Sequence, residues 1–164
     1  ASDVYKRQLL DSECSTMAAR GAAAAHCPTS NMFLGSGLFD LRRLRQEAIR
    51  VGLGTDVGGG TSLSLLKTMR EAYKVLHLQD QPLPPTRAMY LATLGAAKAL
   101  YLDDRIGNFV IGKEADFIVL DPRGTAISAH RTATANTVEE LLFALIVLGD
   151  DRNVAATYLQ GHRA

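Results

Sequence analysis

The sequence has no tryptophan, only two cysteines and no long apolar run. Cys14 and Cys27 form no CxxC or similar metal-binding or redox spacing, so we expect two free, buried thiols in a reducing, cytoplasmic setting. The longest apolar stretch near the C-terminus, 141–148, has eight residues, whereas a membrane-spanning helix needs about 20. We therefore expect no membrane segment.

The sequence also lacks an excess of charge of either sign. Eighteen basic and 17 acidic residues give a net charge of +1, and the basic residues are spread along the chain. Nucleic acid is therefore not expected as a partner. Residues 1–8, ASDVYKRQ, lack the apolar core of a secretory signal. What remains, 164 residues of which 47% are hydrophobic and 21% charged, is typical of one globular unit or a piece of a larger one.

The first two thirds of the chain alternate between expected helices and strands. This order is typical of a parallel α/β sheet or barrel. The expected elements are a helix capped by Asp11 or Ser12 and stopped by Gly21, a strand at 22–26, a helix from Asp40 ended by Gly52, a strand at 51–55, and helices at about 62–78 and 86–100.

The pattern then changes to short strands separated by turns. Gly107, Asn108 and Gly112 are turn residues, and 115–121, ADFIVLD, is the clearest strand. We expect a helix at about 138–148, a terminal strand at 154–162, and a loop over 122–136. These strands predict a small appended sheet.

The stretch GLGTDVGGGTS, 52–62, places a single acid, Asp56, where a strand stops. Ligands of α/β folds bind at the carboxyl ends of parallel strands, so an acid at this point can be catalytic. The glycines at 58, 59 and 60 leave room for a ligand or metal. Two alternatives remain: Asp56 caps the following helix, or the segment is a dinucleotide loop, although its spacing is GxGxxxG and not GxGxxG.

A second group of polar residues follows the strand at 22–26. His26 ends that strand, so it is expected at the same edge of the sheet as Asp56. Residues 28–31, PTSN, predict a rigid loop held by bonds from side chains to the backbone. His26 can bind a metal, line a pocket, or support the loop from behind the site. The remaining histidines, His77, His130 and His162, have no metal-binding spacing and are expected at the surface.

Four segments together resemble the C-terminal part of the guanine deaminase family of the amidohydrolase superfamily. The resemblance covers the chain from about Leu9 to its end, and GTDVGGGTS with IGNFVIGKEADFIVLD downstream is its most specific part. The segments are AHCPTSNMFLGSGLFDL, VGLGTDVGGGTSLSLLKTMREAYKV, YLATLGAAKAL and LDDRIGNFVIGKEADFIVLD.

The resemblance implies an α/β fold: the C-terminal portion of a (β/α)8 barrel plus strands of a small β-sandwich. The last two barrel strands and their helices fall in 9–105, and the segment with the sandwich strands in 106–164. Residues 1–8 do not fit the family pattern, and we expect them to be a leader that is not native to the gene.

The resemblance also implies the chemistry. It implies a zinc-dependent hydrolysis of guanine to xanthine and ammonia, in a homodimer. Asp56 matches the acid that binds the metal and transfers the proton of the attacking water. His26, Asn31, Thr55 and Gly58 are implied to line the pocket or to support the site.

The family's other site residues belong upstream of Leu9 and are absent from this sequence. They are an HxH pair, a further histidine, a glutamate and a substrate-binding arginine. Because a complete barrel takes about 250 residues, we expect the chain to be a fragment that is inactive alone. Two alternatives remain: an amidohydrolase for another N-heterocycle (an adenosine derivative, cytosine or a triazine), or a non-catalytic α/β binding module.

Overall fold

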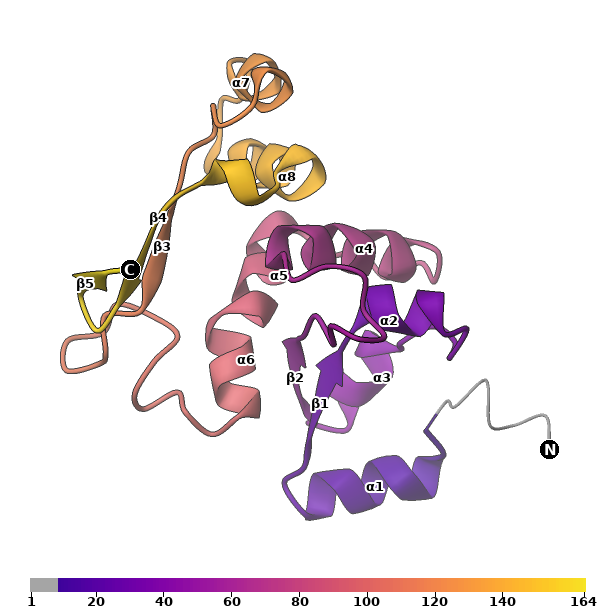
Figure 1. Cartoon of the computed structure of the whole chain (residues 1–164). Helices are drawn as coiled ribbons and strands as arrows, with labels where there is room; N and C mark the ends of the chain where they lie inside the picture. Colours follow the sequence, from indigo (N-terminus) through magenta and orange to yellow (C-terminus); the bar gives the residue numbers. More distant parts are fainter. Residues whose placement is uncertain (1–8) are drawn as a thin grey trace.

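Two separate sheets organise residues 9–164, and Figure 1 shows β3, β4 and β5 set apart from β1 and β2. The computed structural model describes residues 9–164, so the expected leader at 1–8 lies outside the described residues. The elements are α1 (Asp11–Ala19), β1 (Ala23–His26), α2 (Pro28–Phe33), α3 (Leu41–Gln46), β2 (Arg50–Leu53), α4 (Leu65–His77), α5 (Pro85–Ala92), α6 (Leu94–Ala99), β3 (Phe117–Leu120), α7 (Ala126–Thr132), α8 (Val138–Leu148), the short 3-10 helix η2 (Asp151–Asn153), β4 (Val154–Leu159) and β5 (His162–Arg163).

The first sheet is the expected parallel pair. β1 and β2 run side by side, with Ala23 opposite Arg50 and His26 opposite Leu53. The predicted end of the helix before β2 was wrong, because α3 stops at Gln46 and Gly52 lies inside the strand. A Cβ on Gly52 would lie 2.7 Å from the Cα of Ala96, so glycine here lets α6 pack directly on the strand.

The sequence predicted a rigid loop at 28–31, and this prediction was wrong. These residues form the start of α2. Pro28 occupies the first helical position, where a missing N–H costs nothing and the fixed φ favours a helix. The three polar residues that follow Pro28, at 29–31, are therefore helical, although their types are common in turns. Thr29 and Ser30 are buried, so tertiary packing stabilises this six-residue helix.

The helices after β2 follow the apolar pattern, with one break. α4 is capped by Ser64, and its buried positions repeat at helical spacing. The single helix expected at 86–100 is two, because Thr93, with φ −124° and ψ −102°, separates α5 from α6. Among residues 9–164, no helix combines the length and apolar character needed to cross a membrane.

The second sheet is antiparallel, in the order β3-β4-β5. The expected terminal strand is a hairpin, because Gln160 and Gly161 adopt positive φ and turn the chain into β5. The expected loop at 122–136 contains α7, which begins at a capping box between Thr125 and Ser128. α8 spans the predicted residues, and the Arg70 guanidinium of α4 donates to Val147 O of α8 at 2.9 Å.

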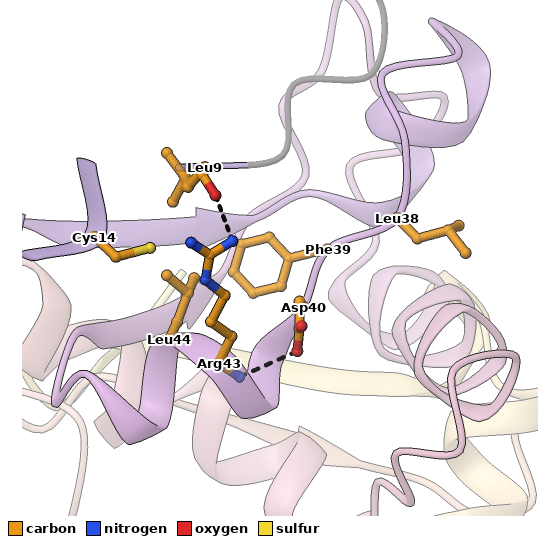
Figure 2. A pocket seen from close by; sticks show the side chains of 7 residues that line it. All are labelled: Leu9, Cys14, Leu38, Phe39, Asp40, Arg43 and Leu44. Carbon is orange, nitrogen blue, oxygen red and sulfur yellow. Dashed lines mark hydrogen bonds between the residues drawn. The ribbon is translucent and has the colours of Figure 1, made fainter. Parts of the chain in front are cut away.

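A small apolar pocket lies between α1 and α3. Its lining consists of Leu9, Cys14, Leu38, Phe39, Asp40, Arg43 and Leu44, and Figure 2 shows Arg43 bonded to the carbonyl of Leu9 and to Asp40. The Arg43 guanidinium also pairs with Asp11 at 2.6 Å, which ties α1 to α3. The pocket holds about 70 Å³, far less than the roughly 300 Å³ of the smallest usual ligand sites, so it is a packing gap.

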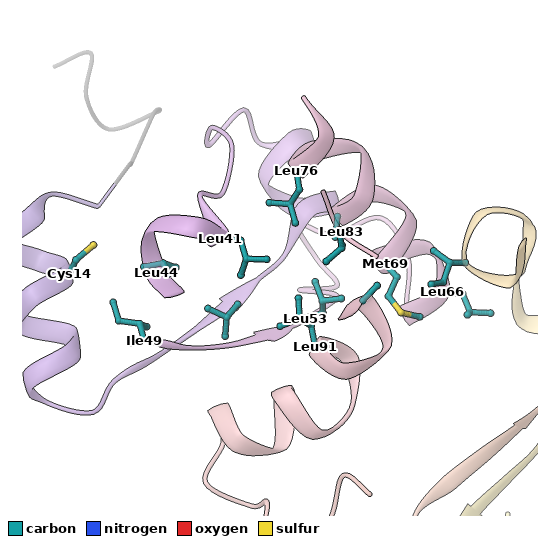
Figure 3. Packing of buried hydrophobic residues seen from close by; sticks show 14 residues of the cluster. Cys14, Leu41, Leu44, Ile49, Leu53, Leu66, Met69, Leu76, Leu83 and Leu91 are labelled. Atoms are coloured by element: carbon teal, nitrogen blue, oxygen red, sulfur yellow. The ribbon is translucent and has the colours of Figure 1, made fainter. Parts of the chain in front are cut away.

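The main hydrophobic core lies between β1–β2 and the helices around them (Figure 3). Its buried members come from α1, α3, β2, α4, α5 and α8, with Ile49 and Leu83 from the connections. They are Cys14, Leu41, Leu44, Ile49, Val51, Leu53, Leu66, Met69, Ala72, Leu76, Leu83, Ala88, Leu91 and Ile146. Cys14 is thus buried as expected, whereas Cys27 is half-buried, and both are free.

Candidate active site

The parallel pairing of β1 and β2 brings the two sequence-predicted polar groups to one edge. His26 is the last residue of β1, and its register partner Leu53 is the last residue of β2. The chain continues past Leu53 to Asp56 within three residues. The backbone N–H of Gly54 donates to the carbonyl of His26 at 3.0 Å, which extends the pairing to the start of the Asp56 loop.

The loop around Asp56 is tightly wound. Asp56 has a φ of 48°, in the left-handed region that few non-glycine residues occupy. Its carbonyl accepts from Gly60 N at 2.5 Å, and Gly58 N donates to Gly60 O at 3.3 Å. A Cβ on Gly60 would lie 1.8 Å from Thr55 O, so only glycine permits this turn. Asp56 is therefore held in an uncommon conformation by its own loop.

Asp56 does not cap the following helix. The N-cap of α4 is Ser64, whose hydroxyl accepts from Lys67 N at 3.4 Å. The Asp56 side chain is exposed, and a Cβ on the neighbouring Gly58 would meet nothing within 4 Å. Asp56 is thus accessible at the edge of the sheet, where its carboxylate can act as a metal ligand or a general base.

The start of α2 packs against this loop. The Thr29 hydroxyl donates to Thr55 O at 3.5 Å, and the Cys27 sulfur lies 3.2 Å from where a Cβ on Gly54 would be. Burial, and secondly the negative charge of Asp56, raise the pKa of the Cys27 thiol. Sequence reasoning did not single out Thr29 as a site residue. The sequence feature that could have indicated Thr29 is its place directly after Pro28, close to the end of the strand.

His26 occupies a different environment from Asp56. Its imidazole is fully buried and stacks on Phe39, with ring centroids 4.4 Å apart. Neither ring nitrogen has a hydrogen-bond partner, and burial lowers the pKa of His26 to about 4. The ring is therefore neutral at pH 7 and faces the core, and its predicted role in the pocket or its support stays a prediction.

The other expected residues are placed as follows. Asn31 lies in α2, half-buried, with its backbone N–H donating to Cys27 O and its carbonyl accepting from Ser36 N, each at 2.9 Å. Thr55 is half-buried and precedes Asp56. Three further histidines are exposed, as predicted: His77, His130 and His162.

The donor set is compatible with part of a zinc site. An exposed carboxylate suits Zn²⁺, which accepts Asp oxygens. Between residues 9 and 164, no three His, Cys, Asp or Glu side chains come together at one point. The described chain thus offers one ligand, Asp56, where a catalytic zinc site takes about three from the protein.

Comparison with known proteins shows the family of this chain. The sequence pattern of the amidohydrolase family matches residues 4–164. The chain belongs to the amidohydrolase family. This amidohydrolase chain is 50% identical to guanine deaminase of Escherichia coli over 140 residues, which are 85% of the chain and 32% of that relative. The resemblance to the guanine deaminases is thereby confirmed.

Solved structures give the same result. The E. coli guanine deaminase structure superposes with a TM-score of 0.94 over 96% of this amidohydrolase chain and 37% of that one, at 46% identity. A guanine deaminase from C. acetobutylicum with bound guanine matches over 95% of this chain and 37% of its own (TM-score 0.81, 28% identity). An adenosine deaminase from Xanthomonas campestris with bound zinc matches over 96% of this chain and 35% of its own (TM-score 0.78, 28% identity).

These matches identify the mixed α/β structure as part of a TIM-barrel hydrolase fold. This amidohydrolase chain spans about a third of the length of the relatives it matches.

Proposed function

We propose that this chain is the C-terminal third of a zinc-dependent guanine deaminase, which hydrolyses guanine to xanthine and ammonia. One observation carries the proposal: an exposed carboxylate, Asp56, follows a parallel strand in a chain 50% identical to E. coli guanine deaminase. The bound guanine of the C. acetobutylicum relative supports the substrate. The zinc of the X. campestris relative supports the metal.

In this proposal β1 and β2 are the last two strands of the barrel, and Asp56 is both metal ligand and proton carrier. A zinc ion held in part by Asp56 would lower the pKa of the attacking water from 15.7 to about 7. The Asp56 carboxylate accepts a proton from the attacking water as the new bond from oxygen to C2 of guanine forms. Asp56 then returns the proton to the 2-amino nitrogen as its bond to C2 breaks, so ammonia leaves.

The exposure of Asp56 supports this role, because a ligand can reach an exposed carboxylate. His26, Asn31 and Thr55 support the site from the strand ends and the following helix. In the same proposal, β3, β4 and β5 form part of a small β-sandwich. The exposed apolar side chain of Val119 on the edge strand β3 supports a further covering layer.

A hybrid enzyme tests the catalytic part of the proposal. In it, the part of this chain that matches E. coli guanine deaminase replaces the corresponding 140 residues of that enzyme, and xanthine formation is followed by absorbance. We expect the hybrid to deaminate guanine, and Asp56→Asn to lower kcat at least a thousandfold. Asp80→Asn is the matched control, because Asp80 is also exposed and has a φ of 53°. An Asp56→Asn hybrid with normal kcat would exclude Asp56 from the chemistry.

The substrate needs a second test, because most of the substrate-binding residues are expected upstream. The full-length protein that carries this chain, called the complete enzyme below, is assayed with guanine, adenosine derivatives, cytosine and triazines. Turnover of guanine above the others supports the proposal. Turnover of another N-heterocycle with none of guanine favours the alternative amidohydrolase, and no turnover of any favours a binding module.

A further inference from the structure

Asp56 is held on one side by a residue of α2 and on the other side by its own loop. On its N-terminal side, Thr55 O accepts from the Thr29 hydroxyl at 3.5 Å. On its C-terminal side, the Asp56 carbonyl accepts from Gly60 N at 2.5 Å. Gly59, which directly precedes Gly60 in this turn, lies against α2.

Gly59 is the point where α2 meets the loop. A Cβ on Gly59 would lie 2.6 Å from the Ser30 hydroxyl oxygen, 3.0 Å from Leu34 Cδ1 and 3.6 Å from Asp56 Oδ2. The Ser30 oxygen and the Asp56 carboxylate therefore both lie next to the position that a side chain on Gly59 would take. Ser30 is only 2% exposed, so its side chain has little freedom to move away.

This contact matters for the direction of the carboxylate, because Asp56 has a left-handed backbone conformation. A non-glycine residue in that region costs on the order of 1 kcal/mol and persists only where the surroundings impose it. If the loop relaxes, Asp56 changes its backbone conformation and its carboxylate changes direction. A metal ligand displaced in this way binds less tightly, as happens when outer groups that orient ligands are removed.

We propose that Ser30 is a positioning residue: by contact with Gly59 it keeps Asp56 in the left-handed conformation and so directs its carboxylate toward the metal. Thr29 supports the other side of the same residue. This inference rests on the proposed function, in which Asp56 is a zinc ligand. Ser30 itself touches neither metal nor substrate.

The test measures zinc affinity in the complete enzyme, by competition of the metal-free protein with a chromogenic chelator. We expect Ser30→Ala to weaken zinc binding about tenfold or more and to lower kcat by a similar factor, with KM for guanine within twofold of wild type. Ser128→Ala is the matched control, because Ser128 is also buried but lies in α7. It should lower thermal stability and leave zinc affinity unchanged. Zinc affinity within twofold of wild type in Ser30→Ala would overturn the proposal.

A double-mutant cycle tests whether Ser30 acts through Gly59. Gly59→Ala alone should weaken zinc binding, because the new methyl group collides with the Ser30 oxygen. In the double variant the methyl group takes the place of that oxygen and restores the contact. We therefore expect the double variant to bind zinc better than Gly59→Ala. Purely additive effects would overturn the proposal.

Two outcomes remain to be separated. If Ser30→Ala does not fold, Thr29→Val carries the test, because it keeps the side-chain volume and removes only the hydroxyl that binds Thr55 O. A loss of zinc affinity of at least threefold is expected, and unchanged affinity would overturn the inference. If the wild-type enzyme binds zinc but does not deaminate guanine, the proposed substrate fails, while the effect of Ser30 on zinc affinity is still decided.

Discussion

His26 lies on the ring of Phe39, with centroids 4.4 Å apart and 19° between the ring planes. Both its nitrogens are buried without a hydrogen-bond partner. Charging such a ring means placing an imidazolium in apolar surroundings, and burial accordingly lowers the pKa of His26 from 6.5 to about 4. The burial of His26 at the end of β1 should therefore make the stability of the fold depend on pH.

We expect this histidine to destabilise the protein in acid. Because the folded-state pKa lies below the unfolded value, the unfolded chain binds more protons between pH 6.5 and 4. Stability is complete above pH 6.5 and falls as the pH drops toward 4, by about 2 kcal/mol at pH 5. Thermal unfolding of the complete enzyme at pH 7.5 and pH 5 measures the loss. His26→Leu should lose less, and equal losses in both proteins would contradict the assignment to His26.

At pH 7.5 the same His26→Leu variant should be close to neutral in stability. The ring makes no hydrogen bond that leucine would break, and leucine can pack against Phe39. We expect a change in the free energy of unfolding within about 1 kcal/mol. A loss well above 2 kcal/mol would mean that another part of the complete enzyme supplies a partner for a His26 nitrogen.

Gly52→Ala should destabilise the packing of α6 on β2. The new Cβ would lie 2.7 Å from Ala96 Cα, a backbone atom that cannot rotate away. We expect the free energy of unfolding to fall by roughly 1–3 kcal/mol, as in other overpacked cores, measured by urea denaturation of the complete enzyme. Gly54→Ala is the control, since its Cβ would meet the Cys27 sulfur at 3.2 Å, which has some freedom to adjust. An equal loss in both variants would argue against a specific role of the Ala96 contact.

Asn153→Ala should remove a buried polar connection in the second half of the chain. The Asn153 amide donates to Asp121 O at 2.8 Å and to the Ser128 hydroxyl at 3.1 Å, and its oxygen accepts from Asp150 N at 3.2 Å. Alanine removes all three bonds and leaves the Asp150 N–H without this acceptor, at about 2–3 kcal/mol of unfolding free energy. Asn136→Ala, at an exposed site, should change stability by less than about 0.5 kcal/mol. The thermal midpoints of the two variants give the comparison.

The 164-residue chain, prepared alone, should associate or unfold without a sharp transition. In the part of the chain that the structure describes, β1 pairs only with β2, so its other edge is open. Large apolar side chains such as Phe109 and Ile111 are 81% and 101% exposed. Open edges and exposed apolar surface promote pairing with other chains. Sedimentation and thermal melting test this, and a monomer with a sharp, reversible transition would contradict it.

Elements with a complete local signal were predicted from the sequence. α8 begins after the cap Thr137 and spans the predicted residues, and β3 lies inside the predicted strand. Segments whose conformation depends on contacts with distant residues were not predicted correctly. α2 resembles a loop by composition and becomes helical because Thr29 and Ser30 are buried against other elements.

The same division holds for the candidate site. The sequence by itself determined that an acid, Asp56, follows a strand and precedes a glycine cluster, because strand, turn and helix each have a local pattern. Only the tertiary structure decided that α2 contacts the Asp56 loop and that the buried His26 stacks on Phe39. Thr29 and Thr55 are 26 residues apart, and no periodicity in the sequence specifies a contact at that separation. The pairing of β1 with β2 creates it, because parallel strands bring the segments that follow them to the same edge of the sheet.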